Sequence, residues 1–125
     1  MSEQRPWIIE IEPEVRDWLS LLSHTQCAFV ERVADRLLPD PLAASGPYAK
    51  SLGGNLRELR FHLGDIAVRI PYWLAPDRRI VLLTVFRKTR MNEHGEVERA
   101  RVVQKLRESE HDAATHEFDR SGEDA

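Results

Sequence analysis

The fold is decided by residues 56–90, which read LRELRFHLGDIAVRIPYWLAPDRRIVLLTVFRKTR. Polar and apolar side chains alternate over 58–63 and again over 66–73, which is the pattern of strands with one buried face. Residues 80–86 carry a single polar side chain, Thr84, as expected for a strand that is buried on both faces. The stretch therefore predicts three neighbouring strands.

Turn residues separate these strands and set their register. The first break, at Gly64 and Asp65, suits a two-residue hairpin loop because glycine readily adopts a positive φ. Counting outward from this loop pairs Arg60 with Arg69 across the two strands. The second break, at 75–78, suits a type I turn with proline as its second residue.

The two paired arginines are predicted to lie on the face opposite the apolar side chains of their strands. Like charges directly across a ladder destabilise a sheet by about 0.2–1 kcal/mol. A bound anion would reverse that effect between Arg60 and Arg69. In the alternative interpretation, Glu58, Asp65 or an acidic helix neutralises both guanidinium groups.

Basic residues are concentrated in this part of an otherwise acidic chain. The 125 residues carry a formal net charge of −3. Residues 55–90 hold eight Lys and Arg against three acids, a local charge of +5. Because guanidinium groups bind phosphates through paired donors, the sequence favours an anionic partner, with nucleic acid first, over a solvated charged surface.

The same motifs resemble those of the RelE/ParE superfamily of bacterial toxins, in particular its phage-derived HigB-like branch. The matching segments are LRELR at 56–60, VRI at 68–70 and FRKT at 86–89. The resemblance covers residues 7–107. It implies an α+β, RelE-like fold with a small, mostly antiparallel four-stranded sheet packed against N-terminal helices and a C-terminal helix.

The flanking segments predict the remaining elements. They are a strand at 7–11, a helix from Pro13, a second helix that Ser23 caps, a loop at 41–55 and a third helix after residue 95. Residues 1–107 are expected to form one domain. Residues 108–125, which are rich in acids, are expected to be a disordered tail.

Residue types and spacing disfavour several other classes of protein. The five histidines lie in separate predicted elements and Cys27 stands alone, so we predict neither a metal site nor a cofactor. The sequence contains no apolar leader and no run approaching the roughly 18 apolar residues of a membrane span. These features predict a soluble, cytoplasmic protein that does not contact a membrane.

RNA permits a metal-free reaction that suits this set of side chains. A 2′-hydroxyl can attack its adjacent phosphate if cations stabilise the developing charge and other groups transfer protons. Arg60, Arg69 and Lys88 are the expected catalytic cations, and His62 is the candidate for proton transfer. The residues expected to bind RNA around them are Arg57, Arg87, Arg90 and Lys50.

The resemblance implies a function of the same kind. It implies the toxin of a type II toxin-antitoxin system, a ribosome-dependent endoribonuclease that cleaves mRNA and inhibits translation. The implied partners are the ribosome, mRNA and a cognate antitoxin with a helix-turn-helix domain, which would form a heteromeric complex with the toxin. The final helix lacks the tyrosine typical of RelE, so the general acid and base stay open.

Two other functions remain open at this point. ParE-like relatives have the same fold and inhibit DNA gyrase by binding to it. An inactive phage-derived protein would only bind RNA or its partner. The LRELR and FRK motifs favour the ribonuclease.

Overall fold

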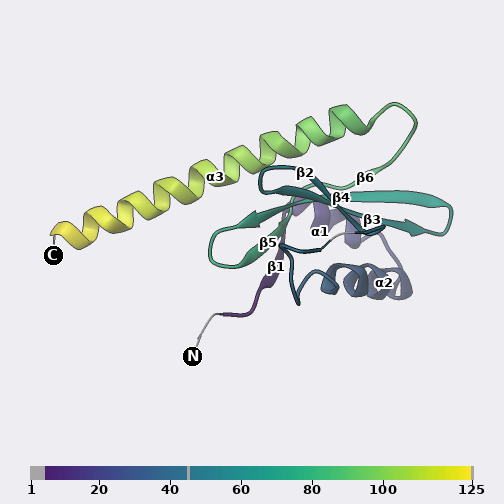
Figure 1. Ribbon diagram of the computed structural model, residues 1–125, viewed down its shortest axis with the longest axis horizontal. Coiled ribbons are helices and arrows are strands. Elements are labelled where there is room, and N and C mark those ends of the chain that lie inside the picture. The colour runs from purple at the N-terminus through teal and green to yellow at the C-terminus, as the bar shows by residue number, and fades with distance from the viewer. Residues whose placement is uncertain (1–4, 45, 125) are drawn as a thin grey trace.

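A computed structural model describes the backbone of residues 5–44 and 46–124 and the side chains of residues 5–44 and 46–110. Nine elements follow one another along these residues. They are β1 (Ile8–Ile11), α1 (Pro13–Leu19), α2 (His24–Asp35), β2 (Ala49–Gly53), β3 (Leu56–Leu63), β4 (Ile66–Ala75), β5 (Arg79–Leu82), β6 (Phe86–Arg87) and α3 (Glu93–Asp124). The sheet lies between α1 and α2 on one side and the long helix α3 on the other (Figure 1).

The sheet is mostly antiparallel, as the resemblance implied. Its strand order is β1-β5-β4-β3-β2, with β6 paired to β4 beside β5. Only the pairing of β1 with β5 is parallel among the described strands. The expected α+β architecture is confirmed, with two more strands than the four expected.

The central hairpin has the predicted register. Gly64 has a φ of 59° in the turn between β3 and β4. On either side of it, Arg60 pairs with Arg69 and His62 pairs with Ala67. The two arginines are therefore direct cross-strand neighbours.

The second turn differs from the type I turn that the sequence predicts. Ala75 pairs with Arg79, and positive φ values occur at Asp77 (65°) and Arg78 (58°). A type I turn has negative φ at both of its central residues. The guanidinium group of Arg78 lies 5.0 Å from the centre of the Trp7 ring, a cation–π contact that helps to hold this conformation.

The predicted strand at 80–87 is interrupted and forms both β5 and β6. Its partner strand contains Pro71, whose carbonyl accepts a 2.9 Å hydrogen bond from the Leu83 amide but which has no N–H to return. Beyond this point the Val85 amide donates to a carboxylate oxygen of Glu14 at 3.0 Å. The missing donor and the competing carboxylate explain the break in the ladder.

One strand, β2, was missed because it lies within the predicted loop at 41–55. Only Ala49 is buried in it, and Lys50, Ser51 and Gly53 are exposed. Five residues with one buried side chain show no usable alternation. The pairing with β3 forms this strand, and that pairing depends on tertiary structure.

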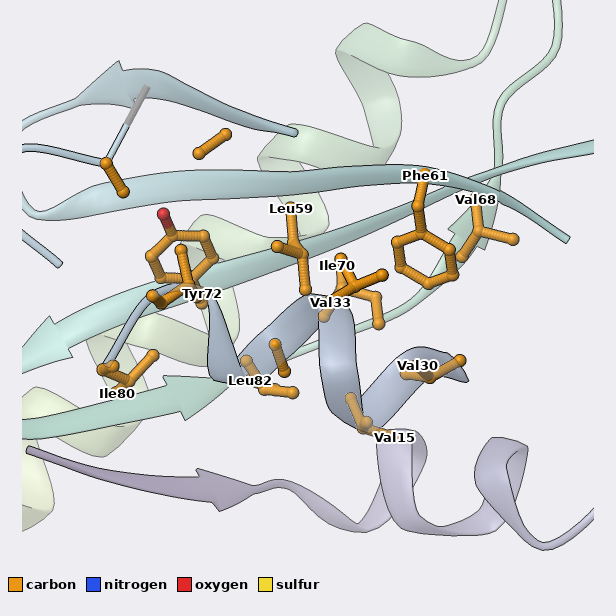
Figure 2. Close-up of a cluster of buried hydrophobic side chains, with 14 of the residues drawn as sticks. Val15, Val30, Val33, Leu59, Phe61, Val68, Ile70, Tyr72, Ile80 and Leu82 are labelled. Carbon is orange, nitrogen blue, oxygen red and sulfur yellow. The ribbon is translucent and has the colours of Figure 1, made fainter. Parts of the chain in front are cut away.

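The main core fills the space between the sheet and the first two helices. The buried side chains Val15, Val30 and Val33 from the helices meet the inner side chains of β3, β4 and β5 (Figure 2). The predicted capping box starts α2: the Gln26 amide donates to the Ser23 hydroxyl, and the Ser23 amide donates to the Gln26 side chain. A second cluster joins α3 to the opposite face of the sheet through Trp73, Val97 and neighbouring side chains.

The backbone of helix α3 is helical through Asp124. The disorder expected for residues 108–125 stays a prediction. In Figure 1 the C-terminal half of α3 projects beyond the edge of the sheet. Among the described residues, no helix combines the length and the apolarity needed to span a membrane.

Candidate nucleic-acid interface

Four of the predicted site residues lie on the α3 side of the sheet. Because side chains alternate along a strand, Arg60 and His62 of β3 lie on the face opposite the buried Leu59. Arg69 lies beside Arg60 on β4. The Lys88 amide donates to the Ala67 carbonyl at 2.8 Å, which continues the pairing of β6 with β4 and places Lys88 on the same face. We call these four residues the cation face.

The small residue Ala67 lies at the centre of the cation face. It separates His62 on one neighbouring strand from Lys88 on the other, which places those two backbones about 10 Å apart. Arg60 and Arg69 form the next row along the strands, about 7 Å away. The residue at the centre of these polar side chains therefore carries only a methyl group.

The two arginines differ in their access to solvent. The side chain of Arg60 is 31% exposed and that of Arg69 is 9% exposed. Arg69 also donates from Nη1 to the Val68 carbonyl at 3.2 Å. Arg60 can therefore contact a ligand directly, whereas the more buried Arg69 acts on the ligand mainly through its charge.

A buried carboxylate lies against both guanidinium groups. Glu58 is fully buried, and its Oε1 lies 3.8 Å from Nε of Arg60 and 3.8 Å from Nε of Arg69. These separations exceed hydrogen-bonding distance. Neither Glu58 oxygen has a hydrogen-bond partner among the described residues, and the two Nε atoms have none either. Glu58 therefore compensates the arginines through charge and does not occupy their donors.

Burial and neighbouring charges perturb the ionisation of this cluster. Burial raises the pKa of the Glu58 carboxyl above its ordinary value, and the Glu93 carboxylate on α3 raises it further. The cations nearby, first Arg69, oppose this increase without reversing it. Burial and the charge of Arg60 lower the pKa of Arg69. The guanidinium still stays protonated, because arginine is not deprotonated in proteins.

The alternative interpretation, in which acids neutralise the arginine pair, is partly correct. Glu58 lies near both arginines, and Glu93 at the start of α3 acts on Arg69 through its charge. The cation face nevertheless carries Arg60, Arg69 and Lys88 against these two carboxylates. A net positive charge remains for an anion, and the partly exposed Arg60 side chain can reach it.

The remaining predicted residues lie in different places. Lys50 is exposed on β2 opposite Glu58, so it borders the cation face. Arg57 lies on the other side of the sheet, where it donates to the Ala44 carbonyl and to the Tyr72 hydroxyl. Arg87 pairs with Val68 and also faces that other side. Arg90 is exposed beyond the end of β6.

Of the two acids in this cluster, the sequence named Glu58 as a possible partner of the arginines but did not name Glu93. Glu58 had a usable signal, because it lies two residues before Arg60 and therefore shares its face. Glu93 had none, since its approach to the sheet depends on how α3 packs. Among the described side chains, no group of His, Cys, Asp and Glu is arranged to hold a metal ion.

Family membership follows from the sequence as a whole. Residues 17–119 match the family described as phage-derived protein Gp49-like (DUF891). Because the match spans most of the 125 residues, the chain belongs to this family. No curated protein is similar enough in sequence to match it.

Solved structures with a similar fold are RelE toxins. The free E. coli toxin RelE, in a mutant form, is 14% identical, covers 78% of this chain and 96% of its own, and gives a TM-score of 0.56. RelBE2, a toxin-antitoxin complex from Mycobacterium tuberculosis, contains a chain that is 20% identical with coverages of 67% and 100% and a TM-score of 0.50. The archaeal RelE-RelB complex from Pyrococcus horikoshii contains a chain that is 22% identical, covers 69% of this chain and 99% of its own, and gives a TM-score of 0.50. At these identities the likeness establishes the RelE-like fold.

Proposed function

We propose that this chain is the toxin of a type II toxin-antitoxin pair and that it cleaves mRNA on the ribosome without a metal ion. The observation that carries the proposal is the gathering of Arg60, Arg69, Lys88 and His62 on one face of the sheet around Ala67. This arrangement suits a phosphodiester, and the RelE-like fold is consistent with it.

The reaction needs only a positioned phosphate and two proton transfers. The 2′-oxygen forms a bond to phosphorus while the bond to the 5′-oxygen breaks, which leaves a cyclic phosphate and a 5′-hydroxyl. Arg60 stabilises the charge that develops on the phosphate oxygens, with Arg69 behind it. His62 is exposed, and an imidazole can accept or donate a proton near neutral pH, so it is the candidate for one proton transfer. Lys88 stabilises charge or supplies the other proton.

An antitoxin partner is part of the same proposal. Two of the similar folds are RelE chains in complex with RelB. For this chain we expect an antitoxin encoded beside it, with a helix-turn-helix domain, that covers or distorts the cation face. Co-expression of that neighbour should restore growth.

Induced expression with primer extension on translated messages tests the proposal. We expect growth arrest and ribosome-dependent cuts in mRNA. Arg60→Ala and Lys88→Ala should each lower cleavage about 100-fold or more, the usual effect of removing a group that stabilises a transition state. Arg16→Ala is the matched control, because Arg16 is an exposed arginine on α1 and lies away from the cation face.

The other outcomes separate the alternatives. DNA breaks that depend on gyrase would support the ParE-like function. The absence of both mRNA cuts and DNA breaks would support an inactive phage-derived protein. Undiminished growth arrest by a soluble, folded Arg60→Ala and Lys88→Ala double variant would remove the proposed site.

A further inference from the structure

A cavity opens beside the cation face, at the free edge of β3. Its volume is about 510 Å³. Arg60, His62 and Arg69 line one part of it, while Pro47, Tyr48 and Phe61 line another, with Arg36 at the end of α2. We call it the edge cavity. It is the size of a small-molecule site, and it joins phosphate-binding groups to aromatic ones.

The edge cavity exists because β2 is shorter than β3. The ladder between them ends at the pair Ala49 and Leu59, and one further hydrogen bond of 2.9 Å runs from the Arg60 amide to the Tyr48 carbonyl. Backbone groups alternate in direction along a strand, so the amide and carbonyl of His62 point to the same side as those of Arg60. No strand pairs with that side of His62 among the described residues. A donor and an acceptor are therefore presented at the border of the cavity.

A flat cation and an aromatic ring lie together at the cavity. The Arg36 guanidinium lies 5.7 Å from the centre of the Tyr48 ring. Unpaired nucleobases are bound by stacking on aromatic rings or guanidinium planes and by hydrogen bonds to their edges. All three features occur here next to the arginine pair.

We propose that the edge cavity is a nucleobase subsite. It binds the base of the nucleotide whose phosphate lies on Arg60, by stacking against the Tyr48 and Arg36 pair and by hydrogen bonds to the free edge of β3. This inference rests on the proposed function and adds a ligand for groups that the cleavage chemistry does not use. Cations line the cavity, which favours RNA over a strand of a partner protein as its occupant.

Binding of two labelled RNA oligonucleotides of equal length tests the subsite. One carries all its bases and the other is abasic at every position, so both present the same phosphates. The readout is the ratio of their affinities for the full-length protein. Tyr48→Leu should reduce this ratio about ten-fold, since stacking of one base on an aromatic side chain contributes that much. Tyr48→Phe, which keeps the aromatic ring, should keep the affinity ratio of the wild type.

Arg60→Ala distinguishes failure of the subsite from failure of the proposed function. It should weaken binding of both oligonucleotides, because both present phosphates. If it weakens neither, the phosphate site itself is absent. If it weakens both while Tyr48→Leu leaves the ratio unchanged, the base subsite alone is overturned.

Two further measurements complete the test. Tyr48 also contacts the core, so Arg36→Met serves as a second variant if Tyr48→Leu does not fold; it removes the flat cation from an exposed position and should lower the ratio as well. Affinity for the neighbouring antitoxin is measured in parallel. A Tyr48→Leu variant that loses antitoxin binding but keeps its RNA ratio would show that the free edge receives a protein strand, and would overturn the proposal.

Discussion

At the residue scale, Glu58 is the side chain that partly offsets the repulsion between Arg60 and Arg69. Two guanidinium groups side by side on a sheet repel one another, and the buried carboxylate between them offsets that repulsion. Because it lies 3.8 Å from both Nε atoms, it leaves their N–H donors free. This arrangement has an energetic cost, because the Glu58 carboxylate must carry its charge where water cannot solvate it.

Glu58→Gln should change how stability depends on pH. The folded-state pKa of Glu58 is raised by burial and by Glu93, so the folded protein binds this proton more tightly than the unfolded chain. The resulting stabilisation is present below the ordinary pKa of 4.5 and is lost as pH rises through the raised value. Glutamine imitates the protonated side chain. The variant should match the wild type near pH 4 and exceed it in urea unfolding at pH 7–8.

The control for this prediction is Glu31→Gln. Glu31 is an exposed glutamate on α2 and should show no comparable change with pH. If the wild type instead gains stability relative to Glu58→Gln as pH rises, the attraction of the arginines for the Glu58 carboxylate exceeds the cost of burying it.

At the element scale, the helices depend on local signals at their ends. Ser23→Ala removes the hydroxyl that accepts from the Gln26 amide and should lower the free energy of unfolding by about 1 kcal/mol. Urea denaturation monitored by circular dichroism measures the loss. Thr25→Ala, an exposed change in the same turn, should stay within about 0.5 kcal/mol. Equal losses from both would argue against the capping box.

Glu14 connects three elements, because it accepts hydrogen bonds from Arg99 of α3 and from the Val85 amide at the break before β6. Burial raises the pKa of Glu14, but the hydrogen bonds from Arg99 and Val85 outweigh burial and leave the pKa below 4.5. Its contribution to stability is therefore present above pH 4.5 and lost as pH falls through the lowered value.

Glu14→Gln should consequently be less stable than the wild type at pH 7, with a difference that shrinks on acidification. Thermal unfolding between pH 3 and pH 7 measures this trend. A constant difference across that range would mean that packing, and not charge, explains the loss. Glu31→Gln again provides the exposed control.

At the scale of the whole molecule, the two faces of the sheet have different tasks. One face holds the main core against α1 and α2, and the other holds a smaller cluster under α3 together with the cation face. Among the described side chains, Arg107 is the last residue of α3 that hydrogen-bonds to the rest of the fold, where it donates to Glu12 at 2.8 Å. The domain boundary expected at residue 107 stays a prediction.

Shortening the chain tests that boundary. A chain that ends at Glu110 should unfold cooperatively, with a free energy of unfolding within about 1 kcal/mol of the full chain. A chain that ends at Gly95 loses Val97 and Val103 from the second cluster, together with the buried Ala100, and should not fold cooperatively. If the first chain also fails, the remainder of α3 is needed for the fold. Calorimetry of both chains decides this point.

Prediction from sequence worked where the signal is local or alternates along a strand. Gly64 and the alternation around it gave the hairpin, its register and the pairing of Arg60 with Arg69. Prediction from sequence was incomplete where strand pairing or helix packing decides the secondary structure. The strand β2 and the break at Pro71 both differ from what was expected.

The sequence by itself determined which face of the hairpin carries the cations, because side-chain direction along a strand follows from spacing alone. Only the tertiary structure decided what surrounds them. Glu58 became a buried partner and Glu93 a neighbour once α3 packed across the sheet. The edge cavity exists because β2 stops short of the end of β3. Strand spacing fixes direction, but burial and charge compensation depend on segments that are distant in sequence and meet only in the folded chain.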